Sequence, residues 1–175
     1  LEGIHSRTDF DLKAHEKFSG KKLQYFDHEE NKSYVPYVVE TSIGLDRMFL
    51  TVLSHSFREE QLESGESRVV LKIPAILAPI KAAVIPLKKN NEALVEAAIK
   101  LKNKLQTIRL GRVVVENTGN IGKSYRKHDE IGTPLCVTID FDTLEKGMVT
   151  IRNRDTMQQE QMPIDEVVNF FKEYF

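Results

Sequence analysis

The second half of this sequence predicts an α/β domain in which helices cover a mixed, mainly parallel sheet. Two observations predict it. From residue 82 onward, short apolar runs typical of buried strands alternate with stretches whose apolar residues recur at helical spacing. The resulting order, β-α-β-α-β-β-α, requires right-handed crossovers between parallel strands, which place helices on the sheet faces. At about 100 residues, such a domain has an ordinary size.

Each element of this domain follows from its local pattern. Strands are expected at Ala82–Leu87, Arg112–Glu116, Leu135–Phe141 and Met148–Arg152, the last two joined by a turn over Asp142–Gly147. Helices are expected from Ala93 to Ile108, from Ile121 to Ile131 and from Ile164 to Phe171. The first of these helices should end near Leu110-Gly111, because glycine commonly follows a helix end.

The first part of the chain has a different pattern. Thr8 or Asp9 can cap a short helix, and strands are expected at Leu23–Phe26 and Tyr34–Val39 on either side of a polar turn. Apolar residues from Leu45 to Phe57 then follow the i, i+3, i+4, i+7 spacing of an amphipathic helix. The charged and polar stretch from Arg58 to Ser67 is the best boundary, so we predict domains at 1–68 and 69–175.

Composition and charge exclude several classes of protein. No apolar run approaches the roughly 20 residues of a membrane helix, and no signal peptide is visible, so a cytoplasmic protein without a membrane partner is expected. The single cysteine, Cys136, forms no internal disulfide, which fits a reducing compartment. The net charge is −1, divided into −4 over residues 1–68 (9 Lys/Arg, 13 Asp/Glu) and +3 over residues 69–175 (16 against 13). The basic excess of the second part is compatible with contact to a phosphate backbone.

Several familiar chemistries are absent. The stretch from Asn117 to Ser124 ends like a phosphate-binding P-loop, but Asn117 replaces its first glycine, so a helix-starting turn is the better interpretation. The five histidines lack metal-binding spacing, and no metal site is predicted. Cys136 lies in an apolar strand and is expected to be a packed thiol, not a nucleophile.

One constellation lies where a strand turns into a helix, from Val39 to Arg47. Glu40 could pair with an ammonium group, and Ser42 could donate to a carboxylate. Gly44 lets a ligand approach the backbone, and Arg47 can stack on a base or bind phosphate. Such junctions are common, so on residues alone a purely structural role is the more frequent explanation.

A second constellation is basic and contains an aromatic residue. Tyr125 lies among Lys123, Arg126, Lys127 and His128 in a predicted helix, and Arg152-Asn153-Arg154-Asp155 follows at a strand end. Basic residues interleaved with an aromatic ring suit single-stranded nucleotides. A solvated helix face is again the commoner explanation of such a pattern.

Both constellations belong to strings that resemble glycyl-tRNA synthetases of the α-dimer type. The strings are Glu2-Gly3-Ile4, Arg7-Thr8-Asp9-Phe10-Asp11-Leu12, Tyr34 to Ser42, Gly44-Leu45-Asp46-Arg47, Leu77 to Lys81, Asp129 to Pro134, Thr138 to Thr143 and Arg152 to Met157. They run over nearly the whole chain, and Gly44 to Arg47 matches motif 3 of class II synthetases. Sister enzymes for other amino acids share the general fold but not this combination.

The resemblance implies a substrate site in the first part. Glu40 and Ser42 would contact the ammonium and carboxylate of glycine, and Gly44 would leave room for so small a substrate. Thr41 stands where the family has proline, which changes the turn but removes neither polar contact. Arg47 would be the catalytic motif 3 arginine that binds ATP and stabilises charge while glycyl-adenylate forms. The ATP site, with Mg²⁺ on the nucleotide, would be formed by Leu1, Gly44, Leu45, Asp46 and Arg47.

For residues 69–175 the resemblance implies a class IIa anticodon-binding domain, a five-stranded mixed sheet with three helices. It would follow the end of a class II antiparallel-sheet catalytic domain, and its fifth strand is expected within Val69–Ile73. Anticodon contacts are expected from Lys123, Tyr125, Arg126, Arg152, Arg154 and Asp155, the last as an acceptor from a cytosine amino group. Asp129 and Glu130 are expected to be helix-end and packing residues.

The resemblance implies a glycine–tRNA ligase that works as a homodimer on glycine, ATP and glycine tRNA. Motifs 1 and 2 are expected upstream, so this chain alone should be inactive. The main alternative is a non-catalytic nucleic-acid-binding protein on the same scaffold, against which the retained Glu40, Ser42 and Arg47 argue.

Overall fold

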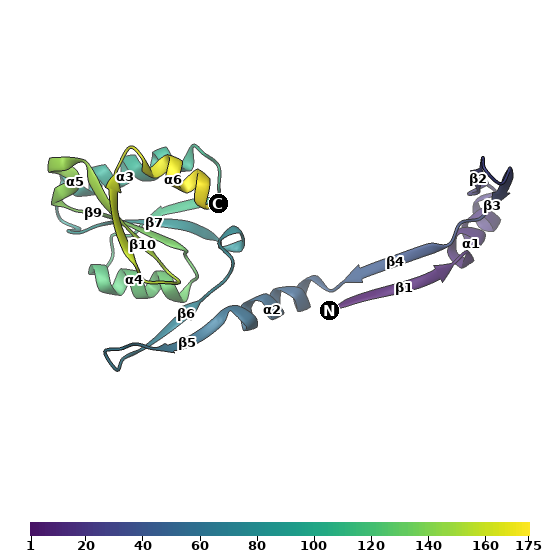
Figure 1. Ribbon diagram of the computed structural model, residues 1–175, viewed down its shortest axis with the longest axis horizontal. Helices are drawn as coiled ribbons and strands as arrows, with labels where there is room; N and C mark the ends of the chain where they lie inside the picture. Colours follow the sequence, from purple (N-terminus) through teal and green to yellow (C-terminus); the bar gives the residue numbers. More distant parts are fainter. The chain divides into compact units, whose positions relative to one another are not determined.

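The computed structural model describes residues 1–175 and consists of two compact units, Leu1–Thr51 and Val52–Phe175 (Figure 1). The boundary falls inside helix α2, which runs from Leu45 to Ser56. The elements of the first unit are β1 (Glu2–Thr8), α1 (Phe10–Ser19), β2 (Tyr25–Asp27), β3 (Lys32–Tyr34) and β4 (Val38–Ile43).

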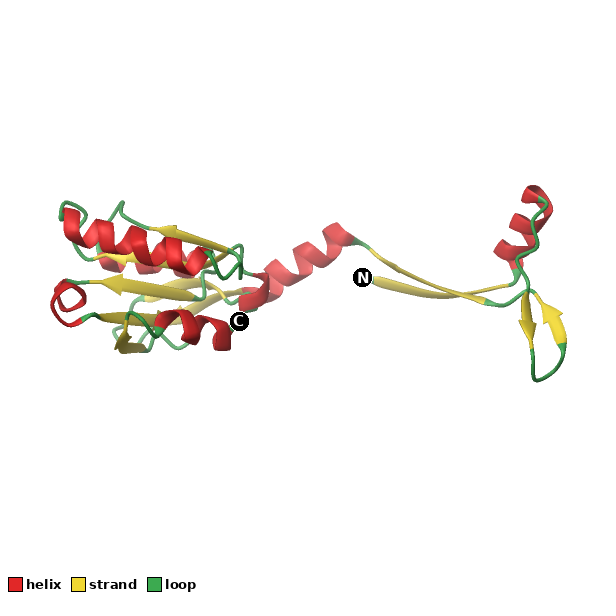
Figure 2. Cartoon of the chain, turned by 90° about the horizontal axis from the view of Figure 1, so that it is seen from above, coloured by secondary structure: helices red, strands yellow, loops and turns green.

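Two antiparallel strand pairs form the first unit. Strands β1 and β4 pair along their length, and the short strands β2 and β3 form a separate hairpin. In Figure 2, α1 and this hairpin extend in opposite directions from the end of the β1–β4 ladder. Helix α1 begins after Asp9, as predicted, but the Asp9 side chain makes no capping hydrogen bond and pairs instead with Lys13 at 2.6 Å. No residue of α1 is buried, so this unit has little core of its own.

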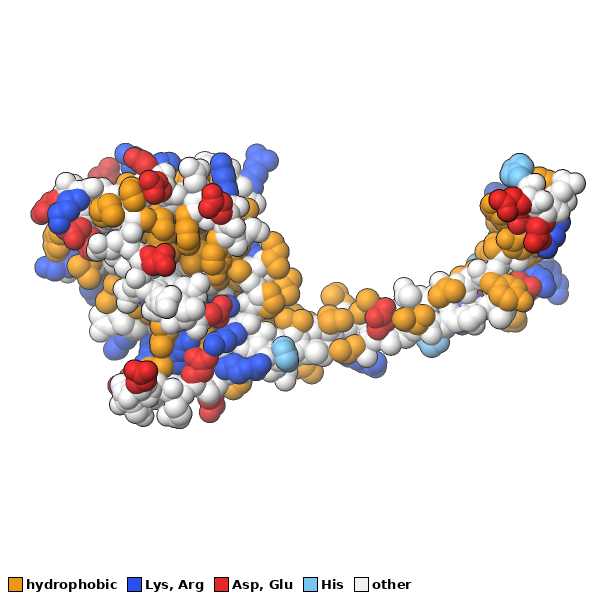
Figure 3. Space-filling model, viewed as in Figure 1, with side chains coloured by type: hydrophobic (Ala, Val, Ile, Leu, Met, Phe, Trp, Pro, Cys, Tyr) orange, Lys and Arg blue, Asp and Glu red, His pale blue; other side chains and the backbone are white.

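Helix α2 has the apolar stripe predicted from its sequence, but the stripe is not covered. Leu45, Phe49 and Leu50 are all largely exposed. Hydrophobic side chains lie on the surface along the β1–β4 ladder and over α2 (Figure 3).

The second unit is built on a five-stranded sheet with the strand order β11-β10-β9-β7-β8 (Figure 1). Its elements are β5 (Phe57–Gln61), β6 (Ser67–Leu71), the 3₁₀ turn η1 (Ala75–Leu77), β7 (Ile80–Pro86), α3 (Glu92–Gln106), β8 (Arg112–Val115), α4 (Ile121–Glu130), β9 (Leu135–Ile139), α5 (Phe141–Lys146), β10 (Met148–Asn153), β11 (Gln159–Pro163) and α6 (Val167–Tyr174). Strand β7 is parallel to β8 and β9, whereas β10 is antiparallel to β9 and β11. The predicted mixed α/β sheet is confirmed.

Alternation along β7 divides the core between two faces of the sheet. Ala82 and Val84 point to the larger core, in which α3 and α6 bury Leu94, Ala98, Leu101, Leu105, Val167 and Phe171. Ala83 and Ile85 point to the other face, against Ile121 and Tyr125 of α4. Helices therefore lie on both faces of the sheet (Figure 2). Cys136 is buried on the α4 side, and burial raises the pKa of its thiol to about 12, as expected for a packed thiol.

Three local predictions need correction. The fifth strand of the sheet is β11, and the stretch predicted to hold it contributes β6, which pairs with β5 in a separate hairpin. The polar segment expected as a boundary forms this hairpin. The expected turn before β10 contains a fourth helix of the domain, α5, which Asp140 and Thr143 begin through a reciprocal capping box and Gly147 ends in a left-handed conformation.

None of the helices combines the length and the apolar composition that a bilayer crossing requires. No group of three or more His, Cys, Asp or Glu side chains is arranged to hold a metal ion.

Candidate nucleic-acid interface and substrate site

The three parallel strands of the sheet end at one edge of the second unit. Because β7, β8 and β9 share a direction, the segments that follow them meet there. The amide of Leu87 donates to the Ile139 carbonyl at 2.8 Å, and the Asn117 side-chain amide lies 3.5 Å from the Lys89 carbonyl. These bonds tie the three segments into a single surface.

This surface is concave, basic and rich in hydrogen-bonding groups. A hollow of about 530 Å³ is lined by Leu87, Lys88, Lys89, Asn90, Thr118, Gly119, Asn120 and Lys123. No acidic side chain is among them. Phe141, at the start of α5, is 41% exposed, and the Lys88 ammonium lies 5.3 Å from the centre of its ring. We call Lys88, Lys89, Asn90, Thr118, Asn120, Lys123 and Phe141 the carboxyl-edge surface.

The chemistry of the carboxyl-edge surface fits unpaired nucleotides. Ammonium groups can contact phosphates, side-chain amides can bond to base edges, and an exposed aromatic face can stack on a base. The sequence prediction included only Lys123 from this set. The signal for the others was the string Lys88-Lys89-Asn90-Asn91 directly after a buried strand, where parallel strands present their ligand-binding ends.

Helix α4 borders this surface and is held in a defined position. Asn120 caps it by accepting a hydrogen bond from the Lys123 amide at 2.9 Å, which leaves the Lys123 side chain exposed. Arg126, one turn on, donates to Glu66 at 3.1 Å and to the Ser67 carbonyl at 3.3 Å. Lys123 is exposed and Arg126 is partly exposed, but the charge of Arg126 is already partly neutralised by Glu66 of the β5–β6 hairpin.

Tyr125 faces inward from α4. Its hydroxyl lies 2.7 Å from the Thr138 hydroxyl on β9, and burial raises the pKa of the phenol. The Arg152 guanidinium lies over its ring at 4.8 Å from the centroid. Tyr125 therefore joins α4 to the sheet.

Arg152 and Arg154 lie below the surface, with exposed fractions of 6% and 3%. Arg152 donates to both carboxylate oxygens of Asp129, at 2.8 and 3.0 Å. Arg154 donates to the carbonyls of Gly132 and Ile73, both at 2.9 Å, and to the Asp155 carboxylate. Little of either guanidinium is therefore exposed for direct contact with tRNA, and the Asp155 carboxylate already serves as the counter-ion of Arg154.

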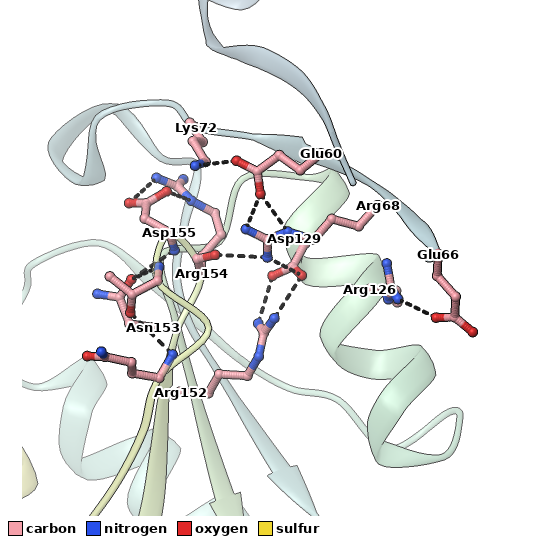
Figure 4. A network of polar contacts seen from close by, with 12 residues as sticks. Glu60, Glu66, Arg68, Lys72, Arg126, Asp129, Arg152, Asn153, Arg154 and Asp155 are labelled. Atoms are coloured by element: carbon pink, nitrogen blue, oxygen red, sulfur yellow. Dashed lines mark hydrogen bonds and ion pairs between the residues drawn. The ribbon is translucent and has the colours of Figure 1, made fainter. Parts of the chain in front are cut away.

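Arg68, which was not predicted from the sequence, completes this network (Figure 4). Its buried guanidinium donates to Asp129 at 3.1 Å, to Glu60 at 2.6 and 2.8 Å, and to the Arg154 carbonyl at 3.0 Å. Two buried arginines thus share the Asp129 carboxylate, and together they join the hairpin, α4 and the end of β10. Asp129 is a packing residue, as predicted, while Glu130 is exposed.

A second polar cluster lies under the loop that follows β8. Lys127 donates to Glu116 at 2.5 Å, and Thr118 donates to the same carboxylate through its hydroxyl and its backbone amide. Burial alone would raise the pKa of Glu116, but these hydrogen bonds outweigh it and lower the pKa to about 2. His128 is buried beside them, 3.5 Å from Glu116 and 2.9 Å from the Thr133 hydroxyl, and burial lowers its pKa.

In the first unit, the β1–β4 ladder arranges the predicted substrate residues. Glu40 and Ser42 lie opposite His5 and Gly3 and share one face of the ladder, whereas Thr41 points to the other. The Arg7 side chain lies 3.6 Å from Glu40. Neither His5 nor Arg7 was predicted from the sequence to be a substrate-site residue.

Glycine opens space at this ladder and at the following turn. A side chain at Gly3 would lie 2.6 Å from the His5 ring and 3.3 Å from the Ser42 hydroxyl. The Gly44 amide donates to the Leu1 carbonyl at 3.3 Å, and the Arg47 side chain folds back over Gly44. The structure thus brings together the Leu1 end of β1, Gly44 and the start of α2, where Leu45, Asp46 and Arg47 form the first turn.

Comparison with known proteins covers both the carboxyl-edge surface and the predicted substrate residues of the first unit. Residues 81–174, more than half of the chain, match the family described as Anticodon binding domain. A glycine–tRNA ligase of Thermus thermophilus is 47% identical over 99% of this chain and 39% of its own length. The ligases of Chlorobaculum tepidum (48% identical, 97% of this chain, 35% of its own length) and Alkaliphilus metalliredigens (49%, 99% and 36%) are similar. The chain spans little more than a third of each of these relatives.

The match covers the strands and helices that form the carboxyl-edge surface, and the similarity to the ligases extends through the β1–β4 ladder as well. The resemblance to glycyl-tRNA synthetases is therefore confirmed, and the chain belongs to the anticodon-binding domain family in the form found in glycine–tRNA ligases.

Proposed function

We propose that this chain is part of a ligase that attaches glycine to its tRNA, and that the carboxyl-edge surface contacts the anticodon loop. The observation that carries this proposal is the set of exposed cations, amides and one aromatic ring at the carboxyl ends of the parallel strands, in a domain of the anticodon-binding family. Relatives of the chain are named as glycine–tRNA ligases.

Different residues of the carboxyl-edge surface would contact different parts of the anticodon loop. Lys88, Lys89 and Lys123 would neutralise phosphates of the loop, while Asn90 and Asn120 would hydrogen-bond to base edges. Phe141 would stack on one splayed base, a contact worth about 1–3 kcal/mol. Arg152 and Arg154 would act from below by fixing α4 and the end of β10.

The first unit supports a role in glycine activation. Glu40 would accept from the glycine ammonium, Ser42 would donate to its carboxylate, and Gly44, which has no side chain, would let the substrate approach the backbone. Arg47 would hold the α-phosphate of ATP and stabilise the charge that develops as glycyl-adenylate forms. The adenine and ribose would lie near Leu1, Leu45 and Asp46, and Mg²⁺ would enter with the ATP phosphates.

The chain holds one part of such a pocket, since it spans 35% to 39% of its relatives. We therefore expect it to form no glycyl-adenylate by itself, and detection of adenylate in an ATP–pyrophosphate exchange assay would contradict this. Homodimer formation, class II membership and a cytoplasmic location stay predictions.

Binding to RNA tests the proposal. A glycine-tRNA transcript and the same transcript with its central anticodon bases exchanged are titrated at two salt concentrations. We expect the exchange to weaken binding, and salt to weaken binding of both transcripts. Equal affinity for the two transcripts would contradict anticodon reading and would favour the alternative, a non-catalytic module that binds nucleic-acid backbone.

A further inference from the structure

A cluster of lysines lies on α1 and directly after its end, in the first unit. Lys13 and Lys17 lie one turn apart on the helix, and Lys21 and Lys22 follow directly after Gly20, which ends the helix in a left-handed conformation. The four side chains, with Glu16 and Gln24, line an open hollow of about 390 Å³. We call Lys13, Lys17, Lys21 and Lys22 the α1 lysine cluster.

Most of the positive charge in this cluster is not neutralised. Lys13 pairs with Asp9, but Lys17, Lys21 and Lys22 have no carboxylate within 4.0 Å. Glu16, the one acidic residue of the hollow, uses its carboxylate to accept the Leu23 amide at 2.7 Å. Three ammonium groups therefore border a hollow whose one carboxylate, that of Glu16, lies more than 4.0 Å from each of them.

An exposed aromatic ring lies beside one of these lysines, Lys17. Phe18 is 85% exposed, and the Lys17 ammonium lies 5.6 Å from the centre of its ring. Attraction of cations to a helix C-terminus accounts for Lys17, but it leaves the exposed ring unexplained. A neighbouring apolar protein surface is a poor partner for this ring, because covering it would also desolvate the ammonium groups beside it.

We propose that the α1 lysine cluster and Phe18 form a second RNA contact, which binds the tRNA outside its anticodon arm. The lysines would contact successive phosphates, and Phe18 would stack on an unpaired base. RNA supplies both partners at once, a chain of phosphates and exposed base faces. This inference rests on the proposed function, since it takes the tRNA as the ligand.

The test compares two RNAs and two matched variants of the whole chain. The variant Lys21→Ala/Lys22→Ala removes two charges from the cluster. Lys100→Ala/Lys172→Ala removes two charges from exposed positions on α3 and α6 and serves as the control. Each is titrated with the complete tRNA transcript and with the isolated anticodon stem–loop over a range of salt concentrations, and circular dichroism verifies that each variant is folded.

The cluster variant is expected to bind the complete transcript more weakly, with a slope of log affinity against log salt that is smaller by about 1.4 to 1.8. Its affinity for the stem–loop should be unchanged, and the control variant should bind both RNAs like the parent. Phe18→Ala should likewise weaken binding of the transcript alone.

Two results would overturn the inference: equal binding of the transcript by the cluster variant and the control, or an equal loss for both RNAs. Failure of the proposed function would be visible separately, because the parent chain would then bind the stem–loop without regard to its anticodon bases.

Discussion

Replacing Asp129 by asparagine removes the carboxylate that two buried arginines share. Asp129 is 1% exposed and accepts hydrogen bonds from Arg152 at 2.8 and 3.0 Å and from Arg68 at 3.1 Å. The variant keeps the shape of the side chain but leaves Arg152 with no acidic partner and Arg68 with Glu60 alone. Removing one member of a buried ion pair typically costs about 3–5 kcal/mol, so we expect a loss of that size in the stability of the second unit.

Hydrogen exchange of the slowest amides in β7 and β9 measures this loss, because these central strands report the opening of the whole sheet. Glu66→Gln is the matched control, since Glu66 pairs with Arg126 at the surface and its loss should cost less than about 1 kcal/mol. Adding Arg152→Met to Asp129→Asn should recover part of the stability, because it removes an unpaired buried charge. A loss below about 1 kcal/mol for Asp129→Asn would refute the view that this network fixes the domain.

Three further predictions concern the carboxyl-edge surface, the buried histidine and a glycine. Phe141→Ala should weaken binding of the anticodon stem–loop by about 1–3 kcal/mol, whereas Leu144→Ala, at an exposed position on the same helix, should not. Equal curves for the two variants in an RNA titration would exclude the stacking role of Phe141. Burial lowers the pKa of His128, which faces Glu116, Lys127 and Asp129, so the unfolded chain binds a proton near pH 6.5 while the folded chain does not. The free energy of unfolding should therefore fall as the pH drops below that value. Thermal melting should show this pH dependence in the parent and much less of it in His128→Gln. Gly132→Ala should destabilise the second unit by about 1–3 kcal/mol in a urea titration, because Gly132 has φ +79° and a side chain there would lie 2.9 Å from Ile73. Gly147→Ala should cost less in the same titration, because Gly147 has φ +68° but open space around it.

The parts of the fold that were predictable from sequence are those whose patterns are strong and local. The parallel strands β7, β8 and β9 are short apolar runs, and α3 repeats its apolar residues over four turns. Strand β11 was missed because Gln159–Pro163 is a polar edge strand, with neither apolar alternation nor a buried face. Helix α5 was missed because six residues are too few for a helical period, although Asp140 marks its start.

The site was less predictable because burial of a charged residue depends on partners far along the chain. Arg152 and Arg154 look like surface cations in the sequence, yet their partners come from segments that are 22 to 81 residues away. Lys88 and Lys89 were missed for the opposite reason. Their string follows a buried strand, but it joins Lys123 in one surface only because the parallel order of the strands brings the two segments together.

Helix α4 also differs from α3 in how it is attached, and this has a consequence for recognition. The buried residues of α3 are all apolar, whereas those of α4 are Ser124, His128 and Asp129. Apolar packing tolerates small rolls and slides of a helix, but hydrogen bonds are directional and lose strength quickly when either partner turns. Helix α4 is therefore fixed in rotation as well as in position, so the spacing between its outer side chains is set before any ligand arrives. Under the proposed function, a substitution of the exposed Lys123 would change RNA binding without disturbing the side-chain hydrogen bonds that anchor the helix.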